Sequence, residues 1–428
     1  WAAIVGNGYN SSSTGEGTAS LFIVYLDAPT ETVGDDDTDN DGIRNDGFGD
    51  YTIIKASTNT WLHCANENEE CSLPETSQVR YSLADGTYKS EARTGTFTCD
   101  VATFSDLGGA KVCEYSDNNG LSQPRIIDID RDGTIDRIYA GDLHGNMWVF
   151  DVSEDGTDTG EGHRTGAASW DLHVAETPFY TACSANLNNG VCPRDQRQPI
   201  TSTPLITNNP LQIDDDTAPN HIVFFGTGQY LTDDDEDDDI AQSFYAIWDA
   251  GVDSSNLDRD NLTPRIIVNE LVNGVETGNR TITDGTVNYS QSATPEPLYG
   301  WYYERLPDSK ERVVLEPLFQ TLIPTRGACN ATAGSGYIMA VDALTGGNPS
   351  IDLFGESDGN NIAGIKVRSV IVGSSITKKK DGTEINIKTA DGKITTQKLS
   401  QGVDGNINDA GAGNLYKFKG RKSWSILR

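Results

Sequence analysis

The sequence predicts an all-β fold built from a repeated strand unit, and three observations support this prediction. Helical periodicity is nearly absent. Loops of very different lengths separate the strand-like segments. One pattern recurs, a bulky apolar strand that runs into an aspartate-led turn, in LFIVYLDA from Leu21, NMWVFDV from Asn146, SFYAIWDA from Ser243 and YIMAVDALTG from Tyr337. Irregular repetition of one strand type is typical of a β-propeller, and a β-sandwich is the alternative.

The remaining elements follow in chain order. A first strand is expected within Trp1–Asn10, and residues 51–115 are expected to form a cysteine-containing insertion in a single domain of residues 1–428. Apolar β-type runs predict strands at Ile138–Ala140, Met147–Phe150, His221–Leu231, Tyr299–Pro307 and Glu311–Pro317. Asp381-Gly382 and Asp391-Gly392 are turn signals of a hairpin region between Thr377 and Ser400, and Asn414–Phe418 predicts one more strand.

The charge of the chain restricts its partners. The 428 residues include 64 acidic and 32 basic side chains, which gives a formal net charge of −32. Such a chain repels nucleic acid and anionic membranes, so neither a nucleic-acid partner nor direct membrane insertion is expected. No apolar run approaches the length of a bilayer span. The chain opens at Trp1 without an initiating Met, which suggests a product processed or excised from a longer one.

The seven cysteines indicate an oxidising compartment. Cys64 and Cys71 are close in sequence, as are Cys183 and Cys192, and Cys99 and Cys113 are moderately close. Local pairs in polar loops favour disulfides, and no C-x-x-C or histidine spacing supports zinc. Cys329 is left over, either as a free thiol or with a partner outside this sequence.

The stretch from Asp128 to Asp136 has the D-x-D-x-D-G pattern of a calcium loop. Alternating carboxylates converge on one hard cation, the glycine permits a sharp turn, and the seventh position supplies a backbone carbonyl. The twelfth position is Tyr139, so the bidentate glutamate of an EF-hand is missing, and the following residues form a strand rather than a helix. We therefore predict an EF-hand-like calcium site with ligands Asp128, Asp130, Asp132, Thr134 and Asp136.

Two further acidic stretches have different interpretations. Gly42 stands at the sixth position of a second calcium-loop pattern, within a carboxylate-dense segment where accidental matches are frequent. Its candidate ligands are Asp37, Asp39, Asp41, Ile43 and Asn45. The acidic run Asp233–Asp239 does not alternate, and we interpret it as a solvated loop.

Eight segments occur here in an order that resembles the C-terminal domain of the PilY family of type IV pilus tip-associated proteins, also known as PilC-type adhesins. They are WAAIVGNGYN, NGLSQP, DIDRDGTIDRIYAGDLHGNMWVFDV, QPITSTP, VFFGTGQYL with SFYAIWD, GWYYERLP with ERVVLEP, GYIMAVDALTG and GRKSWSILR. Each motif is weak alone, and the specificity comes from their order. The resemblance extends from Trp1 to the last residue and is interrupted by acidic insertions.

The resemblance implies a modified β-propeller related to quinoprotein blades, with long acidic loop insertions and with its first blades missing from this sequence. It implies that calcium in the loop at Asp128 governs pilus extension and retraction. It further implies a role in pilus assembly, surface adhesion and twitching motility. The expected partners are minor pilins at the pilus tip and a host or abiotic surface ligand. The expected location is the cell surface of a Gram-negative bacterium, reached through the periplasm.

Two other functions remain open at this stage. A quinone-dependent dehydrogenase of similar fold would need a cofactor pocket and an aspartate base. The five histidines are scattered without catalytic spacing, and His144 lies in a turn where a solvated role is expected, so no enzyme is predicted. A purely structural extracellular propeller is the second alternative.

Overall fold

The computed structural model is nearly all β-structure, as predicted. It describes residues 2–9, 17–26, 51–57, 61–84, 86–105, 107–129, 133–152, 170–174, 177–188, 190–211, 219–251, 257–287, 289, 298–317, 322–326, 335–349, 354, 356–357, 360–367, 371–379, 382–389 and 394–398. Short 3-10 turns and one helical turn, α1 (Val101–Phe104), complete the described part. No helix in these ranges is long and apolar enough to cross a membrane.

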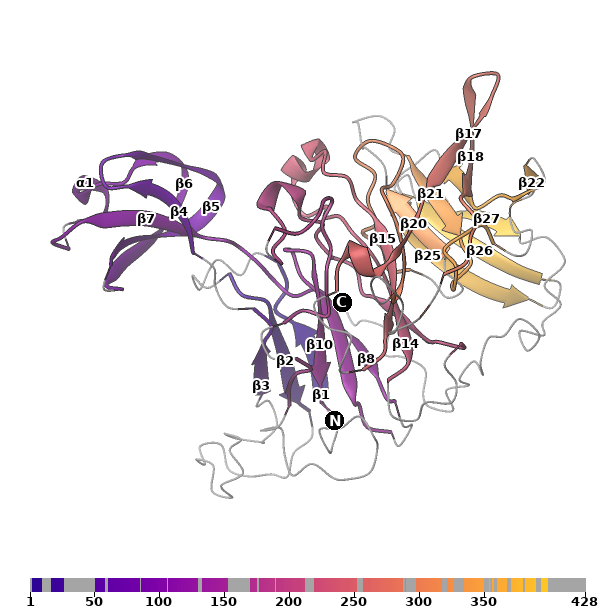
Figure 1. Ribbon diagram of the computed structural model, residues 1–428, viewed down its shortest axis with the longest axis horizontal. Helices are drawn as coiled ribbons and strands as arrows, with labels where there is room; N and C mark the ends of the chain where they lie inside the picture. The colour runs from indigo at the N-terminus through magenta and orange to yellow at the C-terminus, as the bar shows by residue number, and fades with distance from the viewer. Residues whose placement is uncertain are drawn as a thin grey trace.

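Five sheets begin one after another in chain order, from indigo to yellow in Figure 1. Sheet 1 contains β1 (Ala2–Gly6), β2 (Ser20–Tyr25) and β3 (Tyr51–Lys55). Sheet 2 contains β8 (Arg125–Ile127), β9 (Arg137–Gly141), β10 (Asn146–Asp151), β11 (Asp171–Leu172) and β12 (Tyr180–Thr181). Sheet 3 contains β13 (Leu205–Asn208), β14 (His221–Gly226), β15 (Phe244–Asp249), β16 (Thr263–Arg265) and β19 (Gly300–Tyr303).

The last two sheets continue this series. Sheet 4 has the strand order β17-β18-β24-β21-β20, and sheet 5 is the meander β25-β26-β27. Their bounds are β17 Ile267–Val272, β18 Val275–Ile282, β20 Leu322–Arg326, β21 Gly336–Ala340, β24 Gly364–Val367, β25 Ile371–Lys379, β26 Gly382–Thr389 and β27 Ile394–Lys398. A small pair, β22 (Glu356–Ser357) with β23 (Asn360–Asn361), lies between them in sequence. The four repeated segments supply β2, β10, β15 and β21, so the strand part of the repeat is confirmed.

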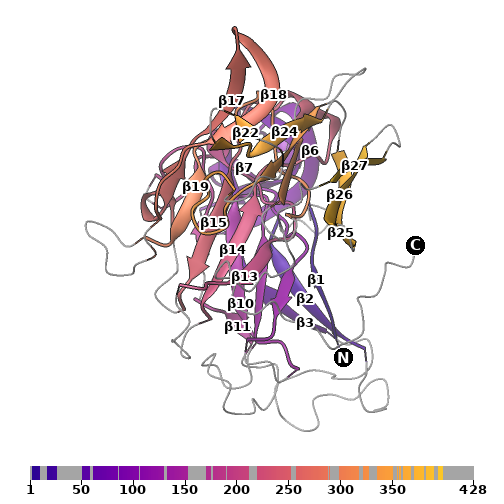
Figure 2. The same ribbon diagram turned by 90° about the vertical axis from the view of Figure 1, so that its right-hand side faces the viewer.

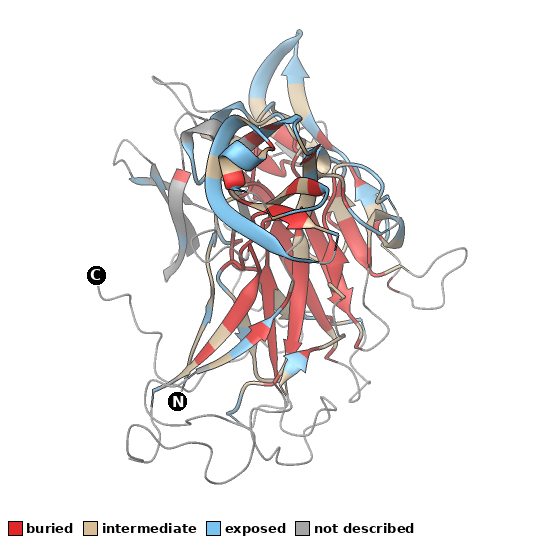
Figure 3. Ribbon diagram, turned by 90° about the vertical axis from the view of Figure 1, so that its left-hand side faces the viewer, coloured by how far each residue is buried: buried red, intermediate tan, exposed pale blue. Residues whose placement is uncertain are grey.

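Sheet 2 buries both of its faces against neighbouring sheets. In sheet 2, Ile138 and Phe150 belong to the core shared with sheet 1, whereas Tyr139 and Val149 belong to the core shared with sheets 3 and 4. A further core joins Ile338 of sheet 4 to Ile371 of sheet 5. Burial on both faces explains why strands such as Met147–Phe150 are apolar without alternation. The buried strands form the centre of the molecule in Figure 3.

The junctions between consecutive sheets repeat one contact. A glycine at the end of a strand, Gly141 in β9 or Gly226 in β14, is covered by an aliphatic residue of the segment that leads to the next sheet. Ile200 covers Gly141 and donates its N–H to Asp142 O at 2.9 Å. Val313 covers Gly226 and donates its N–H to Thr227 O, also at 2.9 Å.

The same contact corrects one predicted strand. Glu311–Pro317 was expected to be a strand, but it runs between sheets 3 and 4 as an irregular segment. Its apolar residues were the reason for the expectation. Val313 is buried because it packs on Gly226, and not because it belongs to a sheet.

Residues 61–116 form a lobe with a four-stranded sheet of their own, to the left of the other sheets in Figure 1. Its strand order is β4-β7-β5-β6, with β4 Trp61–Asn66, β5 Glu70–Leu83, β6 Tyr88–Thr98 and β7 Lys111–Ser116. A separate core that includes Val79, Tyr81 and Phe104 fills the lobe. Tyr51–Lys55, within the segment expected to be inserted, instead pairs with β2 in sheet 1.

The three predicted disulfides are confirmed. Cys64–Cys71 and Cys99–Cys113 close loops within the lobe, and Cys183–Cys192 closes a loop before sheet 3. Cys329 lies outside the described residues, as does the predicted strand Asn414–Phe418.

Candidate metal centre

The predicted calcium loop connects β8 to β9, two antiparallel strands in which Ile127 pairs with Arg137. The structure describes Asp128, Thr134 and Asp136, whereas Asp130 and Asp132 lie outside the described residues. The second predicted site, with Asp37, Asp39, Asp41, Ile43 and Asn45, lies entirely outside them. The loop at Asp128 is therefore the candidate centre that can be described.

The carboxylates at the two ends of this loop turn onto its own backbone. Asp128 Oδ2 accepts the N–H of Gly133 at 3.0 Å, and Asp136 Oδ2 accepts the N–H of Ile129 at 2.5 Å. Gly133 has a φ of 100°, a left-handed value that suits glycine and allows the sharp turn. The described ends of the loop are thus held to its own backbone by these two hydrogen bonds.

The donor set fits a hard cation. Carboxylate and carbonyl oxygens are the ligands that Ca²⁺ prefers in proteins. Within the described ranges, no three Asp, Glu, His or Cys side chains form a group that could hold a metal. A complete ligand set therefore requires Asp130 and Asp132 in addition to Asp128, Thr134 and Asp136.

The end of the loop is fixed in the core of the protein. Asp136 is buried, its N–H donates to Ile127 O at 3.0 Å, and its carbonyl accepts the N–H of Val152 at 2.8 Å. The next residue, Arg137, is fully buried and reaches across to sheet 3. Its Nη1 lies 2.6 Å from Oδ2 of Asp249, the last residue of β15.

Polar groups of sheet 2 and of the segment directly after β11 complete this pair. Tyr139 donates its hydroxyl to Asp249 Oδ2 at 2.6 Å, and the Nη2 of Arg137 lies 2.7 Å from His173 Nδ1. Burial raises the pKa of the Asp249 carboxyl, but the charge of Arg137 and the bond from Tyr139 outweigh it, so this pKa is lowered. Burial and the neighbouring Arg137 both lower the pKa of His173. The loop is thereby joined to sheet 3 through a buried ion pair.

A second buried cluster was not found from the sequence. Asp117, directly after the lobe, lies 2.7 Å from Arg197 Nη2, 3.8 Å from Arg194 Nε and 3.7 Å from His144 Nε2. Arg194 also donates to the hydroxyl of Tyr115 in β7 at 2.9 Å. These residues are far apart in sequence and share no motif, so only the fold brings them together. The cluster attaches the lobe to the segment that follows the Cys183–Cys192 loop.

His144 corrects another expectation. It was expected to be a solvated turn residue, but it is largely buried and its Nε2 lies 3.0 Å from Asn118 O. Burial lowers its pKa, and the nearby Arg197 acts in the same direction. This environment explains its place in the cluster around Asp117.

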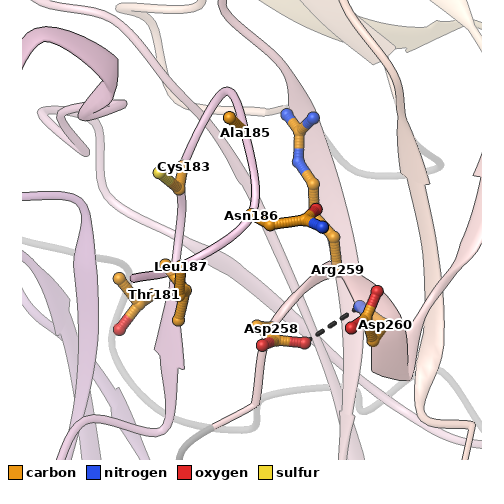
Figure 4. A pocket seen from close by; sticks show the side chains of 8 residues that line it. All are labelled: Thr181, Cys183, Ala185, Asn186, Leu187, Asp258, Arg259 and Asp260. Atoms are coloured by element: carbon orange, nitrogen blue, oxygen red, sulfur yellow. Dashed lines mark hydrogen bonds between the residues drawn. The ribbon is translucent and has the colours of Figure 1, made fainter. Parts of the chain in front are cut away.

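A shallow depression beside the Cys183–Cys192 loop is lined by residues from two segments, 181–187 and 258–260 (Figure 4), including Asn186, Asp258 and Asp260. The guanidinium of Arg259 extends away from the two aspartates. Arg259 Nη2 donates to Ser243 Oγ at 2.9 Å and to Tyr245 OH at 3.0 Å. Because these hydrogen bonds hold Arg259 in the core of sheet 3, we assign it a structural role.

Comparison with known proteins explains why these elements occur together. Residues 108–271 match the family model of the PilY1 β-propeller domain, a range that includes the predicted calcium loop and sheets 2 and 3 up to β16. A type IV pilus biogenesis factor PilY1 of Pseudomonas aeruginosa is 28% identical over 263 residues, which cover 55% of this chain and 21% of that protein. A PilY1 homolog of Xylella fastidiosa is 25% identical over 353 residues, which cover 78% of this chain and 21% of that protein.

A solved structure shows the same fold. The crystal structure of the Pseudomonas aeruginosa PilY1 C-terminal domain matches with a TM-score of 0.54 and 20% identity over 92% of this chain and 69% of that one. The chain spans about a fifth of the length of the curated relatives. The resemblance noted in the sequence is thus confirmed: residues 108–271 match the PilY1 β-propeller domain, and the chain is similar to PilY1 proteins in sequence and in fold.

Proposed function

We propose that this chain is the calcium-binding propeller region of a type IV pilus biogenesis factor that acts at the cell surface. The relatives are named as type IV pilus biogenesis factors, and none of these names describes an enzyme. The observation that carries the calcium assignment is the loop between β8 and β9, whose two end carboxylates fold onto its backbone around Gly133. That loop lies within the matched propeller domain.

The proposal extends to how calcium acts. Without a cation, several carboxylates lie within a few ångströms of one another and repel. Calcium removes this repulsion. It shifts the loop from a loosened to an ordered state, because it binds the ordered state more tightly. Because Asp136 leads directly into the buried pair of Arg137 with Asp249, ordering of the loop reaches sheet 3. We assign to this response the control of pilus extension and retraction, and with it twitching motility and surface adhesion.

Calorimetric titration of calcium tests the site. We expect the wild-type chain to bind one calcium ion at this loop. In the double variant Asp128→Asn, Asp136→Asn, affinity should fall by at least about tenfold because two of the charged ligands are lost. Asp195→Asn is the matched control, since it removes a carboxylate from an exposed position outside the loop. Equal calcium affinity in the wild type and the double variant would contradict the assignment of the calcium site to this loop.

The pilus function needs a separate test in cells. A strain that lacks the full-length protein would be complemented with the wild type, with the double loop variant or with the Asp195→Asn control. We expect twitching zones to return with the wild type and the control, and to remain small with the loop variant. Full twitching with the loop variant would contradict calcium control of motility.

A further inference from the structure

Exposed apolar side chains are concentrated in one hairpin of sheet 4 and in the residue directly before it. Sixteen large hydrophobic residues are exposed in the described part of the chain, and five of them fall between positions 266 and 275. These five are Ile266 (47% exposed), Val268 (47%), Leu271 (60%), Val272 (54%) and Val275 (68%). Single exposed aliphatic residues are common in soluble proteins, but a contiguous group marks an interaction site. We call Leu271, Val272 and Val275 the hairpin tip.

The hairpin is a regular and projecting element. Its strands β17 and β18 pair with Val272 opposite Val275, and the turn residues Asn273 and Gly274 both have positive φ, at 53° and 78°. Two positive-φ residues form the tight turn that matches the twist of the two strands. Figures 1 and 2 show the hairpin extending beyond the rest of sheet 4, with its tip away from the neighbouring sheets. The tip is therefore accessible to a partner and does not pack against the neighbouring sheets.

A buried arginine fixes the base of this hairpin. Arg280 in β18 is fully buried, and its two terminal nitrogens lie 2.6 and 2.8 Å from the carboxylate oxygens of Glu311. Asp308 and Asn269 also accept hydrogen bonds from Arg280, at 3.0 and 2.9 Å. The guanidinium lies over the ring of Tyr337 at 3.2 Å from its centroid. A bidentate, stacked arginine of this kind holds a strand in one orientation.

We propose that the hairpin tip is a docking knob that inserts into an apolar slot with a basic rim on a pilus subunit. Glu270 and Glu276 flank the tip. Among the described residues, the one cation that pairs with them is Lys366, whose Nζ lies 3.8 Å from Glu276 and also 3.4 Å from Asp308. The flanks therefore stay acidic, and a complementary partner carries cations around its slot. A second copy of this chain is disfavoured because each copy carries a net charge of −32. Anionic membranes are disfavoured for the same reason. The choice of a pilus subunit rests on the proposed function.

Binding of purified pilin domains tests the knob. The soluble domain of each minor pilin from the same pilus would be titrated against the immobilised chain by biolayer interferometry. The knob variant is Leu271→Ser, Val272→Ser, Val275→Ser. The control variant changes three exposed aliphatic residues elsewhere, Val101→Ser, Val191→Ser and Leu211→Ser. Both variants should melt like the wild type, because none of the six side chains is buried.

We expect one pilin domain to bind the wild type and the control equally, and to bind the knob variant about a hundredfold more weakly. Glu270→Lys with Glu276→Lys should also weaken binding, and this loss should shrink at high salt. Unchanged affinity of the knob variant overturns the inference, as does the absence of binding by every pilin domain. Calcium titration of the same preparation shows separately whether the proposed calcium function holds.

Discussion

At the scale of single residues, the charges that matter most are the buried ones. Arg137, Asp249, Asp117 and Arg280 all lie almost completely out of water, each with an oppositely charged partner. A buried charge without a partner is strongly destabilising, so each pair fixes how two segments meet. His221 belongs to the same region, because it pairs across strands with Asp249. Its Nδ1 has no hydrogen-bond partner among the described residues.

His221 predicts a loss of stability in acid. Burial lowers its pKa to about 4, with Asp249 and Arg137 as the nearest charges, whereas an unfolded histidine titrates near 6.5. Between these values the unfolded chain binds the proton that the folded chain excludes. The free energy of unfolding should therefore fall as pH drops from 7 to 4, with about 3 kcal/mol from this residue. Urea denaturation at a series of pH values measures this fall.

The variant His221→Gln isolates this contribution. It should lose about 3 kcal/mol less than the wild type between pH 7 and pH 4, although its stability at pH 7 is lower. His63→Gln, at an exposed position in the lobe, is the control and should follow the wild type. Parallel pH curves for His221→Gln and the wild type would show that His221 does not titrate in this range.

At the scale of elements, the segments between sheets are held in place by specific contacts, as the strands are. NGLSQP, QPITSTP and ERVVLEP each place one aliphatic residue, Leu121, Ile200 or Val313, at a junction. In each case the backbone N–H of this residue donates to the residue that follows a strand-ending glycine. The acceptor is the side-chain Oδ1 of Asn7 for Leu121, and the backbone carbonyl of Asp142 or Thr227 for Ile200 or Val313. At two of these junctions a strand-ending glycine meets the aliphatic side chain, Gly141 with Ile200 and Gly226 with Val313, whereas Gly6 meets the backbone of Leu121 and Ser122.

Gly226→Ala should therefore destabilise the protein. A Cβ at this position would lie 2.2 Å from the Cβ of Val313, so the segment between sheets 3 and 4 must shift. Overpacking of this kind costs about 1–3 kcal/mol, measurable by urea denaturation. Gly347→Ala is the control, because its Cβ would first meet the ends of two side chains at 3.3 Å. An equal cost for both variants would argue against the junction.

At the scale of the whole molecule, the proposed calcium loop and the sheets form one connected structure. The loop leads through Arg137 to Asp249 in sheet 3, and the core of sheets 2, 3 and 4 is continuous. A ligand that binds only the ordered state at a hundredfold excess over its Kd stabilises that state by about 2.7 kcal/mol. A free energy of this size is enough to change how often the hydrogen bonds of a neighbouring sheet open locally.

Hydrogen exchange with and without calcium measures this connection. We expect calcium to slow exchange up to about a hundredfold in Arg137–Asn146 and, to a lesser degree, in β15. Asp249→Asn should keep calcium binding but lose the effect on β15, because Arg137 no longer has its charged partner. Exchange in sheet 5 serves as the internal reference. Identical exchange with and without calcium would mean that the loop has only a structural role and does not transmit calcium binding.

Sequence reasoning succeeded where neighbours along the chain decide the outcome. The repeated strands, the glycine turn at Gly133 and the three disulfides all depend on residues within about fifteen positions of one another. Strand type follows from side-chain shape, and a short loop between two cysteines favours their pairing. The ordered motifs also revealed the similarity to PilY1 proteins, because their sequence order is preserved along the chain.

The tertiary structure decided which charges are buried and with which partners they pair. Asp235, within an acidic run expected to be solvated, is buried because its carboxylate accepts the N–H groups of Leu231 and Thr232 at 2.6 and 2.8 Å. Asp249 looked like one more turn aspartate, yet it neutralises an arginine 112 positions away. Burial of a charge depends on what the rest of the chain packs around it, and no local pattern contains that information. The hairpin tip shows the converse, because its aliphatic residues resemble core residues in sequence and only the fold leaves them exposed.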